Sequence, residues 1–409
     1  MKMEIYDATN RIDRPALSVM WIMLLTEDNK QLSGLGLREF QMRFGSAHLK
    51  MGGIEGVNTT EGYRNKGYSR RVMEATIAYM NENGFNVSML FGIPNFYHKF
   101  GYATVIPEIW IDFRREEAQA AVPTYQIRKV EMEDGPKILT LYAANNAQRT
   151  GTLVRGETHW ERFNVENPSN TYGSDFGIFI DPYGEKSLTF GSYGTNDWDR
   201  KAIDLFVVLD EGDEVIGYFA CDATEENCIL CDIGFQNETI FETVVRFLVD
   251  RAKRIGVSQL LCHIPIGHPF AIFCRRYDCR THIHNWKNSG GMMRIINQSS
   301  TLKKITGELG KRLQRSADLG QWRGKILIST DLGQDYLEID RGNIAHTNNQ
   351  ANACHFKTPQ DKLIQLMMGR RSIKDLAIEP DVSVSEEIIP VLDTLFPLGH
   401  PHVWWPDRF

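Results

Sequence analysis

Glycines and basic side chains gather in one stretch of the first quarter of the chain, Gly56–Met73. A Gly-rich, strand-like run ends at Thr59, a polar turn follows, and a helical pattern begins near Arg70. The first turn of a helix has free backbone N–H groups and the positive end of the helix dipole, so it stabilises an anion. Gly67 opens the backbone to a ligand because it has no Cβ. The nearby cations are Arg64, Lys66, Arg70 and Arg71. By itself, the stretch fits a pyrophosphate-binding elbow and an ordinary solvated turn equally well.

A second group of residues that could do chemistry is aromatic. Phe96-Tyr97 precedes Gly101-Tyr102 at the end of a short helical pattern. A phenol with a pKa of about 10 is protonated at neutral pH and can donate to a thiolate whose thiol has a pKa of about 8.5. Phe96 has no such proton. By itself, Tyr97 is more typical of a core aromatic than of a general acid.

The elements that must position these residues follow from the hydrophobic pattern. Residues 1–16 are mostly polar, and no strand is predicted there. The expected strands are Leu17–Leu25, Gln31–Phe44, Ala47–Thr59, Val87–Phe91 and Tyr102–Phe113, and the expected helices are 70–83 and Asn95–Phe100. The third strand therefore delivers the chain to the elbow, and the following helix leaves it.

Length and composition indicate the number of domains and the class of protein. A chain of 409 residues favours two or three domains, and 42% hydrophobic with 24% charged residues is typical of a soluble globular protein. A net charge of −6 suggests neither nucleic acid nor an anionic membrane as a partner. The apolar run Ala16–Leu25 is too short to span a bilayer and lacks a cleavage site, so a cytoplasmic protein is predicted.

The seven cysteines all lie from Cys221 onward, and their odd number argues against a secreted disulfide framework. Cys228 and Cys231 have CxxC spacing, but they fall in a strand-like run without a second matching pair. Buried free thiols are therefore favoured over a metal site, and no metal is predicted.

The middle of the chain repeats the order of the first part. Glu116–Pro123 is a plausible linker, and Ile203–Leu209, Glu214–Cys221 and 227–235 are expected strands before a helix at Thr239–Arg254. A helix at Glu157–Phe163 and strands at Phe176–Ile180 and Lys186–Gly191 are also expected. At the position of the elbow, Gly234–Thr239 lacks both the Arg-x-x-Gly pattern and the basic cluster. An unrelated α/β domain stays open as the alternative.

These features together resemble the GCN5-related N-acetyltransferase (GNAT) superfamily. Arg64-Asn65-Lys66-Gly67-Tyr68-Ser69 matches its acyl-CoA signature Gln/Arg-x-x-Gly-x-Gly/Ala, with Ser69 as a mild departure, and Phe96–Tyr102 matches its second landmark. The resemblance implies acetyl-CoA as co-substrate and Tyr97 as general acid. It places Val57, Asn58 and Thr59 along the pantetheine, Asn65, Lys66, Gly67, Tyr68, Ser69 and Arg70 around the pyrophosphate, and Gly92 and Ile93 at another cofactor contact.

Over nearly its whole length the chain resembles the enhanced intracellular survival protein family. The residues that carry this likeness, besides the elbow and the aromatic motif, are Met51–Ile54, Gly291–Arg294 and the terminal Phe409. The implied α/β (α+β) fold has two tandem GNAT-like domains, 1–123 and a degenerate 124–289, followed by a sterol-carrier-like domain, 290–409. A homo-oligomer is implied, with a hexamer as one form. The family name of the last domain suggests lipid binding. The alternative, which we favour, is a structural role in which the domain delivers the C-terminus.

The resemblance points to the α-carboxylate of Phe409 as the base. Trp404 and Trp405 agree with a buried tail, since such aromatics seek burial. Glu55, on the strand entering the elbow, is the competing base. Arg408 is expected to add a positive charge that disfavours a polycationic acceptor, and the short N-terminus implies a reduced acceptor lid.

The predicted function is N-acetyl transfer from acetyl-CoA to a primary amine by direct attack. The alternative is a catalytically weak acyl-CoA- or lipid-binding protein of the same fold, and the retained Tyr97 argues against it.

Overall fold

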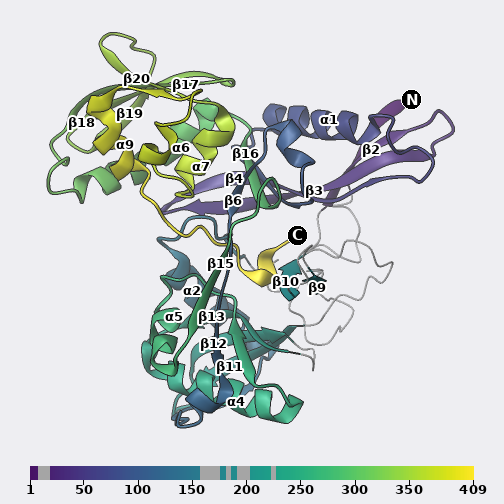
Figure 1. Cartoon of the computed structure of the whole chain (residues 1–409), viewed down its shortest axis with the longest axis vertical. Coiled ribbons are helices and arrows are strands. Elements are labelled where there is room, and N and C mark those ends of the chain that lie inside the picture. The colour runs from purple at the N-terminus through teal and green to yellow at the C-terminus, as the bar shows by residue number, and fades with distance from the viewer. Residues whose placement is uncertain (8–18, 157–175, 181–185, 191–202, 223–226) are drawn as a thin grey trace. The chain divides into compact units, whose positions relative to one another are not determined.

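The structure is a computed structural model, and it describes residues 1–7, 19–156, 176–180, 186–190, 203–222 and 227–409 (Figure 1). It divides into two compact units, each assembled from separate parts of the chain. The first comprises residues 1–106, 148–153 and 286–401, and the second comprises 107–147, 154–285 and 402–409. The predicted domain limits at residues 123 and 289 stay predictions.

The first unit contains a seven-stranded sheet with the order β1-β2-β3-β4-β5-β16-β6. Its strands are β1 (Lys2–Asp7), β2 (Val19–Leu25), β3 (Gln31–Phe44), β4 (Ala47–Thr59), β5 (Val87–Gly92), β16 (Gly290–Ile295) and β6 (Ala103–Ile106). Neighbours are antiparallel except β4 and β5, which run parallel and are connected through helix α1 (Tyr68–Glu82). Figure 1 shows α1 lying along the sheet, where it packs on β2, β3 and β4.

The sequence predicts β3 and β4 with the bounds that the structure has for them. It misses β1, a short strand whose six residues pair antiparallel with β2. The single strand predicted for Tyr102–Phe113 is wrong, because Pro107 separates β6 from β7 (Glu108–Arg114), which belongs to a different sheet. Proline has no N–H for a strand ladder, so it suits this change of sheet.

The second unit contains a sheet that matches the first, strand for strand. Read from its other edge, the order is β8-β11-β12-β13-β14-β7-β15, again with one parallel pair, β13 with β14. The strands are β8 (Gln126–Lys129), β11 (Ile203–Leu209), β12 (Val215–Asp222), β13 (Cys228–Phe235), β14 (Gln259–Cys262) and β15 (Arg280–His284). This confirms a second GNAT-like fold. The two sheets exchange their sixth strands. The sixth strand of the first sheet is β16, which follows the strands of the second sheet in sequence. The sixth strand of the second sheet is β7, which follows β6 of the first sheet in sequence.

Helices α2 (Gly135–Asn146) and α4 (Phe241–Ile255) pack on the second sheet, and α4 buries an apolar side that includes Val244, Val245 and Leu248. The predicted strands β9 (Phe176–Ile180) and β10 (Lys186–Phe190) are present, and they pair with each other in antiparallel orientation. The helix predicted at Glu157–Phe163 lies outside the described residues. All seven cysteines are free thiols, and Cys228 and Cys231 lie buried in β13.

The last part of the chain adds a five-stranded sheet to the first unit, with the order β19-β18-β17-β20-β21. Its strands are β17 (Arg323–Thr330), β18 (Gly333–Asp340), β19 (Asn343–Thr347), β20 (Ala353–Lys357) and β21 (Ser383–Val384). Helix α6 (Gln298–Gln314) packs on β18, β19 and β4, and α7 (Gln360–Met367) packs on β16 and β6. None of the helices in the described ranges is long and apolar enough to cross a membrane.

Candidate acyl-CoA site

A bulge opens the first sheet at the end of β4. Gly36 pairs with Glu55 and Gly34 with Asn58, so Leu35 faces two residues, Gly56 and Val57. Gly56 has a φ of 58°, a left-handed value that favours glycine. The bulge bends β4 away from its parallel neighbour, and their pairing ends at Ile54 and Leu90.

Beyond this point β4 continues to Thr59 and β5 to Gly92 without pairing to each other. The predicted residues Val57, Asn58 and Thr59 lie on this stretch of β4. Its backbone edge toward β5 therefore offers donors and acceptors to an extended ligand that carries amide groups.

Hydrogen bonds hold the end of β4 in place. The Asn58 side chain donates from Nδ2 to the carbonyl oxygen of Gly56 at 3.0 Å and accepts from Nε2 of Gln31 at 3.0 Å. Ser33 Oγ donates to the carbonyl oxygen of Asn58 at 2.7 Å. The amide of Asn58 is therefore committed to stabilising the bulge, and this residue would meet a ligand mainly through its backbone.

The turn after β4 leaves a row of backbone donors open. Asn65 and Gly67 have φ values of 62° and 76°, and α1 starts at Tyr68 without a side-chain cap or an acidic residue in its first turn. Arg64 and Asn65 form a tight hydrogen-bonded turn, whereas the backbone N–H groups of residues 67–70 donate to no other described part of the chain. The hydrogen bonding of the helix begins with Arg71 N–H, which donates to the Gly67 carbonyl oxygen at 3.2 Å. Consecutive free N–H groups at a helix start form an anion-binding cradle.

A Cβ built on Gly67 would meet nothing within 4 Å. Its backbone conformation, and not crowding by protein atoms, therefore requires glycine at this position. The open space is also where a phosphate could approach the chain.

Positive charge surrounds this cradle. Arg64, Lys66 and Arg70 are exposed, and the nearest carboxylate to the Arg70 guanidinium among the ion pairs is that of Glu74 at 3.7 Å. The Arg70 guanidinium also lies over the ring of Phe100, 5.5 Å from its centre. These cations are available to phosphate groups, as the predicted cofactor role of Asn65, Lys66, Gly67, Tyr68, Ser69 and Arg70 requires.

Tyr97 is the first residue of the short helix η2 (Tyr97–Phe100), which follows β5 in the chain. A Cβ added to Gly92 would stand 2.5 Å from the Cδ2 atom of the Tyr97 ring, so the ring rests directly on the backbone of Gly92. Phe96 packs edge-on against Tyr97, with ring centres 4.9 Å apart. The structure thus brings the predicted acid together with Gly92 and Ile93, where β5 has separated from β4.

The two candidate bases have different surroundings. The Glu55 carboxylate is half-buried and accepts from Nε of Arg38 at 2.8 Å, so taking a proton from an amine would break a charge-assisted pair. Phe409 belongs to the second unit, whereas Tyr97 and the elbow belong to the first.

The positive charge expected from Arg408 is neutralised by an ion pair. Arg408 is buried and makes a two-pronged ion pair with Glu108, at 2.8 and 3.0 Å. No sequence pattern signals this pair, because its members stand 300 residues apart in the chain.

The second elbow is closed by its own side chains. Asn237 caps the turn by accepting from Thr239 N–H, and Glu238 places a negative charge in the first turn, which repels an anion. Asn145 accepts from the N–H of Phe235 at 2.7 Å, which ties the end of β13 to α2. That this domain lacks a cofactor site stays a prediction.

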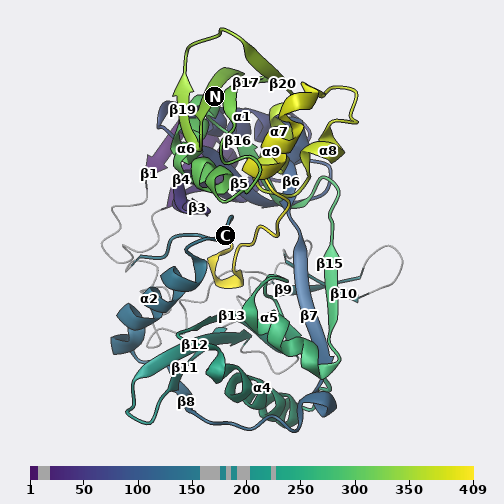
Figure 2. The same cartoon turned by 90° about the vertical axis from the view of Figure 1, so that its left-hand side faces the viewer.

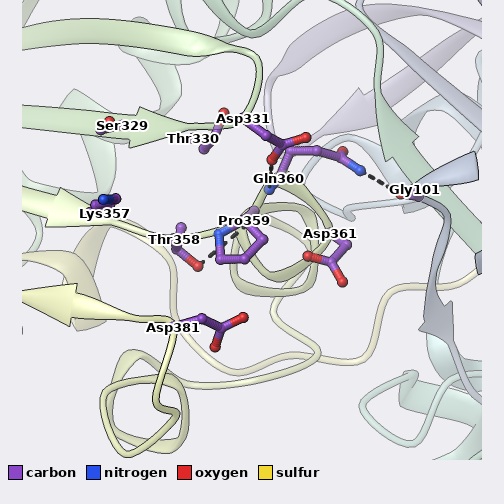
Figure 3. A pocket seen from close by; sticks show the side chains of 10 residues that line it. All are labelled: Gly101, Ser329, Thr330, Asp331, Lys357, Thr358, Pro359, Gln360, Asp361 and Asp381. Carbon is purple, nitrogen blue, oxygen red and sulfur yellow. Dashed lines mark hydrogen bonds between the residues drawn. The ribbon is translucent and has the colours of Figure 1, made fainter.

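A hollow of about 480 Å³ lies in the first unit, lined by none of the predicted site residues (Figure 3). Its lining comes mostly from the last domain and includes the side chains of Asp331, Asp361, Asp381 and Lys357. Gln360 crosses it and donates to the carbonyl oxygen of Gly101.

Comparisons with known proteins agree with this geometry. Residues 4–105 match the family model described as an acetyltransferase (GNAT) domain. This part of the chain, with its elbow and its Tyr97, is therefore a GNAT acetyltransferase domain. The sequence matches none of the curated proteins with which it was compared.

The fold of the whole chain is similar to those of several solved structures. A probable N-acyltransferase from Enterococcus faecalis V583 is similar with a TM-score of 0.72 and 18% identity, covering 96% of this chain and 89% of that one. A GCN5-related N-acetyltransferase from Kribbella flavida has a TM-score of 0.67 and 14% identity, with coverages of 95% and 88%. Eis1 from Mycobacterium abscessus has a TM-score of 0.60 and 12% identity, with coverages of 95% and 90%.

Proposed function

We propose that the protein transfers an acetyl group from acetyl-CoA to a primary amine. The observation that carries this proposal is the open edge between β4 and β5, which has an anion cradle at one end and a tyrosine beside it. The backbone of residues 65–70 would hold the pyrophosphate, and the free edge of Val57–Thr59 would align the pantetheine amides.

The proposed chemistry is one direct displacement. The amine nitrogen attacks the thioester carbonyl carbon, the new C–N bond forms, and the C–S bond breaks. A backbone N–H at the end of β4 polarises the carbonyl, and Tyr97 donates its phenolic proton to the departing thiolate. The α-carboxylate of Phe409 takes the proton that the amine loses, and the products are an N-acetylated amine and free coenzyme A.

Coenzyme A release with a panel of amines tests the proposal, with Tyr97→Phe as the active-site variant. Loss of the phenolic proton should lower kcat by about a hundredfold, within the usual range for a general acid. Tyr102→Phe is the matched control, since Tyr102 is a buried neighbour whose hydroxyl donates to Ser88 at 2.8 Å. If wild type turns over no amine, or if both variants behave alike, the proposal fails.

Two further variants assign the base. Residues appended after Phe409 displace the α-carboxylate and should abolish turnover, whereas Glu55→Gln should leave most of it. The opposite pattern would make Glu55 the base. Calorimetry that shows acetyl-CoA or lipid binding without turnover would favour a binding protein instead. A cytoplasmic location and a homo-oligomer stay predictions.

A further inference from the structure

The C-terminal tail, residues 402–409, is buried in the second unit down to its penultimate residue. The short helix η9 (Trp405–Asp407) lies against β13, and Figure 2 shows this yellow turn beside the strand. Chain termini are usually poorly ordered and exposed to solvent unless specific contacts hold them in place. The burial of this tail therefore requires an explanation.

Ion pairs fix the two residues before the end. Arg408 and Glu108 pair through both guanidinium nitrogens, and their side chains are each 4% exposed. Asp407 accepts from Nε of Arg155 at 2.8 Å and from the hydroxyl of Tyr142 at 3.1 Å. Both pairs join segments that are far apart in the sequence.

Arg155 is shared between the tail and the sheet. Its Nη1 atom lies 2.6 Å from the carboxylate of Asp232 on β13, and its side chain is 2% exposed. The Tyr142 ring covers the guanidinium, whose central carbon lies 3.8 Å from the ring centre. A planar guanidinium that bridges two carboxylates sets both their distance and their orientation, because its donors are rigidly arranged.

Aromatic packing seals the tail in the same place. Trp404 donates from Nε1 to Oδ1 of Asn146 at 2.9 Å, and the ring centres of Trp405 and His263 lie 3.9 Å apart. Trp405 also packs with Ile229 and Cys231 of β13. Both indoles are at most 1% exposed.

The position of the tail on this sheet is informative. Cys221 pairs with Leu230 and Ala220 with Asp232, so β13 has a bulge at Cys231, which corresponds to the bulge at Gly56 in β4. In the first sheet the edge beyond the bulge is open. In the second sheet the tail residues Trp405 and Asp407 occupy this region, through Cys231 and through the Arg155 bridge to Asp232.

Buried ion pairs contribute little net stability, because desolvation of the charges offsets their attraction. They do define one geometry, since any other arrangement leaves a charge buried without a partner. Two such pairs on consecutive residues next to a chain end therefore specify where that end lies.

We propose that the second GNAT-like fold is the receptor for the C-terminal tail, and that Glu108 and Arg155 are positioning residues for the α-carboxylate of Phe409. The catalytic consequence of this inference rests on the proposed function. In the second fold, the chain's own end takes the space that a cofactor would use in an active domain.

The test follows the release of Phe409 by carboxypeptidase A from the full-length protein, together with acetyl transfer. Glu108→Gln leaves the Arg408 charge buried without its partner, so trimming should become about tenfold faster or more. The double variant Glu108→Gln with Arg408→Gln removes both charges and should restore protection. Arg246→Gln, which breaks an exposed pair with Asp250 on α4, is the matched control and should change nothing.

Turnover should depend on whether the tail is held in place. Glu108→Gln is expected to lower kcat by about tenfold while KM for acetyl-CoA stays unchanged, because the elbow is untouched. The double variant should recover only part of kcat, because it leaves no charge buried without a partner but also lacks the pair that positions the tail. Asp407→Asn, which removes charge but keeps shape, provides a second variant if Glu108→Gln does not fold.

Equal trimming of wild type and these variants would overturn the receptor role. Faster trimming with unchanged kcat would overturn the positioning role and leave the acetyltransferase proposal standing. A wild type without turnover would refute the proposed function and with it the catalytic consequence, whereas the trimming series would still decide whether the second fold holds the tail.

Discussion

Gly92 is the residue whose substitution tests most directly how the backbone positions the proposed acid. A Cβ at this position would lie 2.5 Å from Cδ2 of Tyr97 and 2.7 Å from Cδ1 of Leu90. The leucine can rotate, but the tyrosine ring must retreat by about 0.9 Å to reach the 3.4 Å at which ordinary contact begins. Gly92→Ala should therefore displace the phenol while leaving its chemistry intact.

Two magnitudes follow for Gly92→Ala. Overpacking a well-filled site costs about 1–3 kcal/mol of unfolding free energy. A shift of roughly 1 Å in a catalytic group can cost about a hundredfold in rate, so kcat should fall by about ten- to a hundredfold. KM for acetyl-CoA should rise by less than kcat falls, because Gly92 is one predicted cofactor contact and the pyrophosphate cradle lies on another element.

Steady-state kinetics and chemical denaturation measure both effects. Gly307→Ala serves as the control, because a Cβ there meets nothing within 4 Å and a mid-helix alanine should stabilise slightly. In a Tyr97→Ala background, Gly92→Ala should cost clearly less stability, since the ring is gone. An unchanged kcat in the single variant, or an equal cost in both backgrounds, would refute the placement of Tyr97 on Gly92.

Three further predictions concern the cradle, the first core and the tail. Gly67→Ala forces a side chain into the left-handed region and should cost about 1–2 kcal/mol in stability while raising KM for acetyl-CoA more than it lowers kcat, as seen by kinetics at varied acetyl-CoA. Tyr102→Phe removes the hydrogen bond to Ser88 and should cost about 1 kcal/mol. Burial raises the pKa of Tyr102 to about 12, so this cost should stay constant in denaturation experiments across neutral pH. Burial, and then the charge of Arg408, hold the pKa of His263 well below its ordinary value. The unfolded chain then binds the extra proton as pH falls below about 6.5, so stability should drop by up to about 1.4 kcal/mol per pH unit, and His263→Asn should flatten this slope in thermal unfolding.

The parts of the site that the sequence predicts are those with local causes. The elbow is visible because glycine, basic residues and a helix start stand within a few positions of one another. Long strand-like runs that end at turn residues give β3 and β4 their bounds. The packing of Tyr97 also has a local cause, because its neighbour in the chain, Phe96, is its neighbour in space, as their edge-on contact shows.

The features that sequence reasoning misses have partners far away in the chain. Nothing near β7 or β16 indicates that each fills the sixth position of the other half's sheet, because strand pairing is chosen by burial and register and not by local pattern. Arg155 and Asp407 stand 252 residues apart, and isolated charges in a sequence are typical of a solvated surface. Their pairing only becomes visible once the chain is folded.

The two GNAT-like sheets offer an internal comparison of how one fold gains or loses a ligand site. Both have a bulge in the fourth strand, so the bulge alone does not define a cofactor site. They differ in which polar groups are satisfied. In the first, the N–H groups of residues 67–70 donate to nothing in the described chain. In the second, Asn237 accepts from the N–H of Thr239 in the turn, and Asn145 accepts from the N–H of Phe235 at the strand end. Exposed donors cost little while water binds them, so an open elbow can be kept wherever a ligand uses it. Where no ligand does, a cap and an acid close the turn, and the remaining space is free for another use. In this protein a segment of the same chain, the C-terminal tail, occupies it.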